Sequence, residues 1–500
     1  MSRRVEARSH GVAPRAGHGA VALACGLLLG LAGCAQAPPY RKPALDMPVT
    51  WQVEAPWRVG TPEDAAAKGP WWQHFGDTKL DALEQQASTN SPTLELANAR
   101  LAQSRATLAA TLSGLFPQIG LTGRASRLKI SEDRPLTNYS SRNFSTVQND
   151  QQVALTVNYE VDLAGRVQST VEGATASVQQ VTADLENTRL VLSTDLATNY
   201  FNLRALDNEL DVLGRSIALQ RRALELMNSR HDLGAATGLD VAQQQALLDT
   251  TLVQVDVLRR TRGQFEHAIA TLAGIPAPQF SLPPEVRELS PPPVPLGVPS
   301  DLLERRPDIA SAERAMAAAN AQIGVANAAF YPSIVLGPTV GFDTTRLSTL
   351  FDASSLLWSL GLSATQVLFD AGRVSANLDF ARAGHAATVA NYRRVVLGAM
   401  QEVEDGITGL AALDRASAQA RVAVNTATRV LDMATARYEG GASAYLDVIT
   451  AQQSWLTIQR QATQLNGQRL VTSVFLVKAL GGGWQPATQT LSLSSTPKAP

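Results

Sequence analysis

The sequence predicts a mainly helical protein built from two tandem repeats, each containing one β-hairpin and a pair of long coiled-coil helices. Three observations predict this fold. The tetrapeptide AGRV at 164–167 recurs at 371–374, 207 residues later. Each copy is followed by a long proline-free segment with helical apolar spacing. Each copy is also preceded by short segments in which apolar and polar residues alternate, as they do in half-buried strands.

The repeat extends well beyond this tetrapeptide. At the same offset, RHDLGAATGLDV at 230–241 aligns with RYEGGASAYLDV at 437–448. Upstream the offset becomes 215 residues, where FPQI at 116–119 aligns with YPSI at 331–334. The first half therefore holds extra residues between its FP pair and its AGRV.

These alignments divide the chain into two homologous halves and their flanks. The prolines between the halves disfavour both helix and central strand, so we expect a linker there. The expected segments are a signal peptide 1–33, an anchored strap 34–78, repeat 1 at 79–275, a linker 276–300, repeat 2 at 301–482 and a flexible tail 483–500.

The segment that follows the first AGRV is expected to form one very long helix. From 166 to 229 it has no proline, and its apolar residues step by three and four, as in Leu203, Leu206, Leu210 and Leu213. This spacing is that of a coiled-coil seam, and a helix of this length would measure roughly 95 Å. The second copy, about 373–436, is equally long. Carboxylates precede both helices, at Asp162 and Asp370, where each can cap the helix N-terminus.

The alternating segments predict one β-hairpin in each half. In QQVALTVNYEVD, from Gln151 to Asp162, apolar residues share one face and mostly polar residues share the other. Two interpretations are open: a hairpin packed on a soluble core, or membrane strands with lipid on one face and a lumen on the other. Four strands cannot close a barrel, and lipid forbids an open strand edge. If these strands span a membrane, several chains must pool them, and three chains would supply twelve strands.

The N-terminus has the features of a lipoprotein signal. Arginines precede the apolar run VALACGLLLGLAG, which ends directly before Cys34. We expect lipidation at Cys34, although an ordinary signal followed by a chance cysteine gives the same pattern. After cleavage Cys34 is the only remaining cysteine, which excludes a disulfide or a cysteine-based metal site. Trp51, Trp57, Trp71 and Trp72 then either pin the strap to the body or contact the membrane interface.

Composition argues against several function classes. The formal net charge of −1 gives no electrostatic basis for binding nucleic acid. The chain lacks the HExxH, GxSxG and P-loop motifs, and its six histidines are scattered. We therefore expect no enzyme activity, no cofactor and no metal site. An anchored coiled-coil scaffold without a pore is an alternative, but it leaves the four alternating strands unexplained.

Taken together, these features resemble the outer-membrane efflux protein family, the TolC- and OprM-like channels of tripartite pumps. The resemblance is carried by LAGC, by the two halves, by FDAGR opening a long helix, by RPDI at 306–309 and by RYEGGASAYLDVITAQQ, and it covers about 70–482. It implies a homotrimer with a 12-stranded outer-membrane β-barrel and a periplasmic α-barrel. It also implies a periplasmic adaptor, an inner-membrane transporter of the RND type, and export of drugs or other toxic small molecules. A type I protein-secretion channel uses the same fold and stays an alternative.

The resemblance also suggests gate residues at the turns between the long helices. Family members place rings of acidic residues facing the pore there, and Asp447 and, by the repeat, Asp240 are the matching positions. Tyr438 matches a residue that helps to tie neighbouring helices shut. The chain has Ser443 and Thr450 where some members have further charged residues, which implies fewer ties in this pore. A purely structural role as helix caps stays open for both aspartates.

Overall fold

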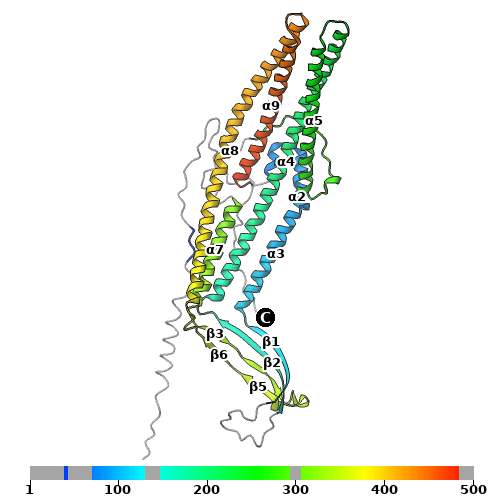
Figure 1. The fold of residues 1–500 in the computed structure, drawn as a ribbon. Helices are drawn as coiled ribbons and strands as arrows, with labels where there is room; N and C mark the ends of the chain where they lie inside the picture. The colour runs from blue at the N-terminus through cyan, green and yellow to red at the C-terminus, as the bar shows by residue number, and fades with distance from the viewer. Residues whose placement is uncertain (1–38, 43–69, 130–146, 293–305, 483–500) are drawn as a thin grey trace, which may run out of the picture. The chain divides into compact units, whose positions relative to one another are not determined.

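The computed structural model describes residues 39–42, 70–129, 147–292 and 306–482 (Figure 1). The predicted signal peptide, Cys34, most of the strap and the C-terminal tail lie outside these residues. The chain divides into two compact units. One contains the whole sheet and the adjoining ends of the helices, and the other contains the remaining helical parts.

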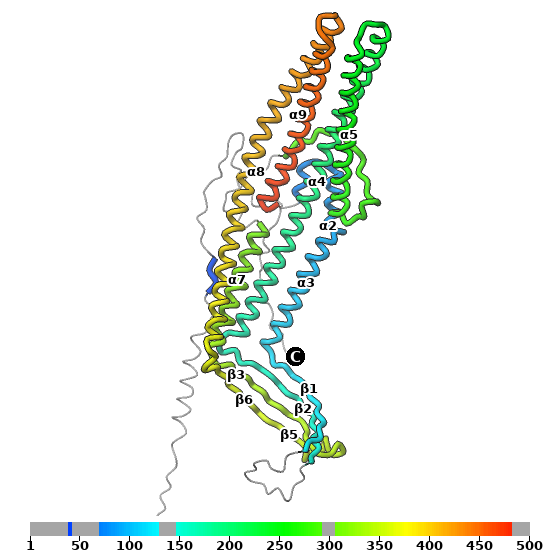
Figure 2. The backbone as a smooth tube through the Cα atoms, in the orientation of Figure 1, coloured from blue at the N-terminus to red at the C-terminus, as the bar shows by residue number. Residues whose placement is uncertain are grey.

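The described elements repeat in the predicted order (Figure 2). The first half contains η1 (Trp71–Phe75), α2 (Thr78–Asn90), α3 (Pro92–Leu112), η2 (Ser113–Leu115), β1 (Gln118–Lys129), β2 (Val147–Val161), α4 (Arg166–Asp232), α5 (Gly238–Leu272) and η4 (Ala277–Gln279). The second half contains α7 (Pro307–Ala328), β3 (Ser333–Leu336), β4 (Thr339–Thr344), η6 (Leu347–Thr349), η7 (Ala353–Ser355), β5 (Leu356–Ser359), β6 (Leu362–Thr365), α8 (Arg373–Glu439) and α9 (Tyr445–Ala479).

The prediction of two very long helices is confirmed. Both α4 and α8 contain 67 residues, and each is followed by a 35-residue helix, α5 or α9. Both long helices begin at the arginine of AGR. Asp162 accepts a hydrogen bond from the backbone N–H of Gln168 at 2.7 Å, and Asp370 accepts one from Val374 at 3.0 Å. The expected carboxylate caps are therefore present.

Among the described helices, none carries an apolar stretch long enough to cross a membrane.

The two predicted hairpins combine into one antiparallel sheet. Strand β2 lies in its middle, paired with β1 on one side and with β4 and β3 on the other. Strands β5 and β6 then pair with β4 and β3. The structure therefore confirms both hairpins and shows that they share a sheet.

The second hairpin differs from the prediction because each of its long strands is divided in two. The break between β3 and β4 falls at Gly337 and Pro338, and proline has no N–H to donate to a strand ladder. The chain stays in register across the break, because Val157 donates to the carbonyl of Pro338 at 2.9 Å and Gly337 donates to that of Gly361 at 2.9 Å. The pairs β3/β4 and β6/β5 thus act as two interrupted strands.

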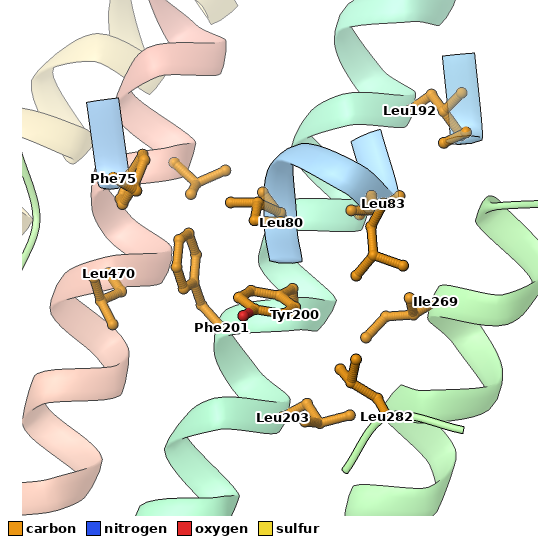
Figure 3. Close-up of a cluster of buried hydrophobic side chains, with 14 of the residues drawn as sticks. Phe75, Leu80, Leu83, Leu192, Tyr200, Phe201, Leu203, Ile269, Leu282 and Leu470 are labelled. Atoms are coloured by element: carbon orange, nitrogen blue, oxygen red, sulfur yellow. The ribbon is translucent and has the colours of Figure 1, made fainter. Parts of the chain in front are cut away.

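The main core of the helical unit lies where α2, α4, α5 and α9 meet (Figure 3). Tyr200 and Phe201 of α4 are fully buried there, and Phe75 packs on Phe201 with ring centroids 4.8 Å apart. The Tyr200 hydroxyl donates to Asp77 at 2.8 Å, and Asp77 caps α2 through the N–H groups of Lys79 and Leu80. One side chain therefore joins the start of α2 to the middle of α4.

Of the four tryptophans near the N-terminus, Trp51 and Trp57 lie outside the described residues. Trp71 is buried and donates its indole N–H to the Ser193 hydroxyl at 3.3 Å, while Trp72 is partly buried against the same core. These two side chains pack on the helical body, as the first of the two sequence interpretations requires.

A buried ionic network holds the proline-rich linker against α4 and α5. The Asp207 side chain is fully buried and accepts from Arg204 at 2.9 Å and from Arg262 at 2.6 Å. The same two arginines donate to linker carbonyls, those of Pro283 and Leu282. The described part of the linker, 276–292, thus packs as part of the core, although its sequence alone indicates only a connector.

The RPDI motif has a structural role at the start of the second half. Arg306 is buried and donates to Asp308, to Glu402 of α8 and to the carbonyl of Ala479. That carbonyl belongs to the last turn of α9, which lacks intrahelical donors. Arg306 therefore satisfies the C-terminus of α9 and joins three segments of the second repeat.

Because Glu84 of α2 is buried, we expect the free energy of unfolding to depend on pH. Its side chain is almost fully buried, and one carboxylate oxygen has no hydrogen-bond partner in the structure described above. Burial, with a smaller contribution from Asp81, raises its pKa to about 9. The folded chain thus keeps a proton that the unfolded chain releases above its ordinary pKa of about 4.3. Stability then falls as pH rises from about 5 to 9, by at most about 1.4 kcal/mol per pH unit.

Glu84→Gln is expected to remove most of this slope, because the amide cannot ionise. Chemical denaturation at pH 6 and pH 8.5 measures the effect. The matched control is Glu95→Gln, because the Glu95 side chain on α3 is exposed. This variant is expected to leave the wild-type slope unchanged. A wild-type slope that persists in Glu84→Gln would contradict the assignment.

Candidate membrane surface and pore gate

One face of the sheet carries an exposed apolar row that crosses all four strand positions. The register aligns Leu121 with Leu155, Leu155 with Val340, and Val340 with Trp358. Their exposed fractions are 71%, 45%, 48% and 74%. Large contiguous apolar surfaces are rare on soluble monomers and mark contact with a partner or a membrane.

The opposite face of the same sheet is small and polar. The neighbouring row aligns Gly120, Thr156, Thr339 and Ser359. Apolar residues on one face and polar residues on the other are typical of a membrane strand between lipid and a lumen. This pattern favours the membrane interpretation over a hairpin packed on a soluble core.

Both edges of this sheet are open in the described part of the chain. Strand β1 pairs only with β2, and β5 and β6 pair only with β4 and β3. An open edge presents unpaired N–H and C=O groups, each of which costs several kcal/mol in lipid. A sheet with this apolar face therefore needs partners at both edges.

The two turns between the long helices repeat in atomic detail. Gly234 and Gly441, 207 residues apart, both adopt positive φ, at 74° and 69°. In each turn the following N–H reaches back to a helix carbonyl: Ala235 donates to Arg230 and Ala442 donates to Arg437. These are the bonds of a helix that ends on a left-handed glycine. The sequence repeat therefore reflects a repeated helical turn.

The two candidate gate aspartates have different surroundings. Asp240 forms a capping box with Thr237: its carboxylate accepts from the Thr237 N–H at 3.0 Å and from the hydroxyl at 2.7 Å. At the equivalent place before α9 the capping residue is Ala444, which has no side-chain acceptor. Asp447 is exposed, and no hydrogen bond or ion pair joins its carboxylate to any described residue. The capping interpretation thus applies to Asp240 and fails for the Asp447 side chain.

Tyr438 of α8 connects the two helix pairs. Its hydroxyl donates to the Met227 sulfur of α4 at 3.6 Å, and the Arg230 guanidinium lies 5.0 Å from its ring centre. Its ring also lies 5.0 Å from that of Tyr445 at the start of α9. Within one chain, Tyr438 therefore contacts the first repeat from the second, close to both turns.

Tyr445 is a further residue of this group that the sequence did not single out. Its hydroxyl donates to Gln244 of α5 at 2.8 Å. Burial, Tyr438 and Asp240 together raise the pKa of Tyr445 to about 12, so the hydroxyl stays protonated and able to donate at neutral pH. The aromatic residue directly before the repeated Leu-Asp-Val could have signalled it, since the first repeat has Gly238 there. Cys34, the predicted lipidation site, lies outside the described residues.

No group of three or more His, Cys, Asp or Glu side chains suited to a metal ion occurs among the described residues. The arrangement is instead one of surfaces: an apolar sheet face with open edges, and helix turns that carry acidic and aromatic side chains. Together they define a class of protein, a membrane channel subunit built from a two-repeat hairpin and long-helix unit.

The family model for outer membrane efflux proteins matches residues 83–275 and 298–482. The chain belongs to this family and is an outer-membrane efflux protein.

Individual relatives match over nearly the whole chain. The pyoverdine export outer membrane protein OpmQ of Pseudomonas aeruginosa is 32% identical over 467 residues, covering 93% of this chain and 97% of OpmQ. The toluene efflux pump outer membrane protein TtgF of Pseudomonas putida is 29% identical over 468 residues, covering 92% and 96%. The solved outer-membrane channel OprN superposes with a TM-score of 0.83 at 27% identity, over 90% of this chain and 100% of OprN. These matches confirm the predicted family, fold class and efflux function.

Proposed function

We propose that three copies of this chain form the outer-membrane exit duct of a tripartite efflux pump. The observation that carries the proposal is the exposed apolar row on a sheet with two open edges. Lipid contact explains the apolar face, and pairing between copies satisfies the open edges. Three sheets of four strand positions supply twelve strands, which close a barrel with a polar interior.

The lipid anchor holds the duct at the outer membrane, and the long helices extend it into the periplasm. Acyl chains on Cys34 hold the N-terminus at the outer membrane, and more than one chain makes the attachment firm. Helices α4, α5, α8 and α9 extend into the periplasm, where the helices of three copies form an α-barrel. Their turns meet a periplasmic adaptor, which joins the duct to an inner-membrane transporter of the RND type.

The turns also form the gate. Three copies of Asp447 make an acidic ring, because the Asp447 carboxylate is exposed and unpaired among the described residues. Such a ring attracts cations and repels anions. Tyr438 holds the second helix pair against the first, which favours the closed state. Asp240 contributes mainly by capping α5.

The duct conducts its substrates and performs no chemistry on them. The two relatives above are named for pyoverdine and for toluene. Matching exit ducts thus serve chemically different cargoes, so we place substrate selection in the inner-membrane transporter. The cargo of this pump belongs to the same broad class of small molecules.

Conductance in planar bilayers tests the proposal and separates the two aspartates. Wild-type trimers are expected to give mostly closed, cation-preferring currents. Asp447→Ala is expected to shift the reversal potential toward anions and to change unfolding free energy by less than about 0.5 kcal/mol. Asp240→Ala is expected to cost about 1 kcal/mol of stability through loss of the cap, with little change in selectivity. Folded trimer that never conducts would overturn the duct.

A further inference from the structure

The apolar side of the sheet becomes cationic at the strand ends farthest from the helices. The register of β1 with β2 is unbroken from Gln118 to Lys129, so successive residues of β1 alternate between the two faces. Arg127 and Lys129 therefore lie on the face that carries Leu121. Both cations are exposed, and neither pairs with a described acidic residue.

The apolar surface of this face ends before it reaches the two cations. The row of residues at Val153 and Phe342 is apolar, whereas the next row, at Gln151 and Thr344, is polar. Phe351 packs edge to face on Phe342, with ring centroids 5.5 Å apart, and is 73% exposed. Aromatic residues border the apolar band of membrane barrels on both sides, so this level marks the start of the lipid headgroups.

A third cation, Arg346, lies at the same end of the sheet, two residues after the end of β4. Its side chain is also exposed and pairs with no carboxylate in the part of the chain that the structure describes. We call Arg127, Lys129 and Arg346 the cationic rim. The rim thus combines two guanidinium groups and one ammonium group beside the polar end of the apolar face.

Acidic residues do not neutralise the rim. Asp150 and Asp343 belong to the opposite face, where Arg124 pairs with Asp150. Asp352 is the one carboxylate between β4 and β5, and segment 130–146 contains two acidic and two basic residues. Three cations against the single carboxylate of Asp352 leave a net charge of +2 at this end of each chain.

The cations at the helix end of the sheet have partners of their own. Arg166 donates two hydrogen bonds to Glu160, at 2.8 and 2.6 Å, and Arg373 lies 3.9 Å from the Asp370 carboxylate. The unpaired cations of the sheet therefore gather at its far end. Guanidinium groups bind phosphate through two parallel hydrogen bonds, and an ammonium group binds it as a point charge. An apolar face that ends in such cations is complementary to a lipid with a phosphorylated headgroup.

We propose that the cationic rim binds the phosphate groups of a glycolipid of the lipid A type in the outer leaflet. This inference rests on the proposed function, which places the apolar face in lipid and the helices in the periplasm, so that the rim lies at the outer leaflet. The acyl chains of the lipid lie along the apolar rows, and its phosphates accept hydrogen bonds from the rim. Each trimer then has three such sites, one in each chain.

Native mass spectrometry of delipidated wild-type trimers, titrated with bisphosphoryl lipid A in detergent, tests the rim. Monophosphoryl lipid A, which has the same acyl chains and one phosphate fewer, is the comparison ligand. The bisphosphoryl form is expected to bind at least about fivefold more tightly, because a basic residue beside an anionic lipid surface contributes roughly that factor. An excess of inorganic phosphate is expected to leave the lipid bound, since the acyl chains also contribute to binding.

Variants locate the binding. Replacing all three rim residues with glutamine is expected to weaken binding of bisphosphoryl lipid A by at least about tenfold. The matched control, Arg221→Gln with Arg421→Gln and Arg429→Gln, removes three exposed cations from the helical unit and is expected to leave binding unchanged. Should the triple rim variant assemble poorly, Arg346→Gln alone, outside the paired strands, is expected to weaken binding about fivefold.

Each other outcome has a definite meaning. Equal affinity of the wild type for both lipids overturns phosphate recognition, and displacement by inorganic phosphate overturns the lipid as the occupant. Unchanged binding in the rim variant, or an equal loss in the control, overturns the location. Conducting trimers that give any of these results leave the duct intact. Trimers that bind lipid A as expected but never conduct overturn the proposed function alone.

Discussion

Asp207→Ala is expected to lower the free energy of unfolding by about 3–5 kcal/mol, the loss typical of breaking a buried ion pair by removing one partner. The Asp207 side chain is fully buried, and its two oxygens accept from Arg204, from Arg262 and from the backbone N–H of Glu285. Removing the carboxylate leaves two guanidinium groups in the core without their main counter-ion. It also frees the linker, because both arginines hold linker carbonyls.

The matched control is Asp211→Ala, one turn further along the same helix. Asp211 also pairs with an arginine, Arg215, but the arginine is exposed and the Asp211 side chain is partly exposed, whereas that of Asp207 is fully buried. An exposed pair of this kind is worth at most about 1 kcal/mol. Denaturant titration of the helical circular dichroism signal measures both variants. A loss at Asp207 no greater than at Asp211 would show that the network does not support the core.

The second large effect is expected at a glycine in the sheet. A Cβ atom added to Gly341 of β4 would lie 2.3 Å from the carbonyl oxygen of Val153 and 2.5 Å from the Cα of Ala154. Both are backbone atoms of β2 that cannot move without breaking the ladder between β2 and β4. Gly341→Ala is therefore expected to cost about 3 kcal/mol and to reduce the amount of assembled protein in the outer membrane.

Gly123→Ala on β1 is the control for that variant, because a Cβ at Gly123 meets no atom within 4 Å. It is expected to change stability by less than about 0.5 kcal/mol. Assembly is read from the heat-resistant oligomer band on a denaturing gel of outer-membrane extracts. If Gly341→Ala assembles as well as Gly123→Ala, the close approach of β2 and β4 does not limit folding.

Much of the fold could be predicted because the sequence contains the same unit, a hairpin followed by long helices, twice. Helical spacing without proline predicted α4, and a second copy at a fixed offset predicted α8 with the same length. The carboxylate before each AGR marked both helix starts correctly. The alternation in 151–162 gave β2, the central strand of the sheet.

What escaped prediction depends on contacts between distant residues. Nothing local shows that Arg204 and Arg262 will hold the linker, because those three segments meet only in the folded helical unit. The split of the second hairpin follows from Pro338, but the alternation on either side of it hides the break. At the turns, the equivalence of Asp240 and Asp447 suggested equal roles, whereas Thr237 and Ala444 make one a capping residue and leave the other unpaired.

Disulfide cross-linking between the two open edges of the sheet most directly tests whether copies of the chain complete a barrel. Single cysteines are placed in turn along β1, at 118–129, each combined with Ser359→Cys on β5 at the opposite edge. The outer membranes are oxidised and run on a denaturing gel. At one or two neighbouring β1 positions, the proposal predicts linked species of two and three chains and nothing larger. Only single chains at every position, from protein that is folded and inserted, would contradict it.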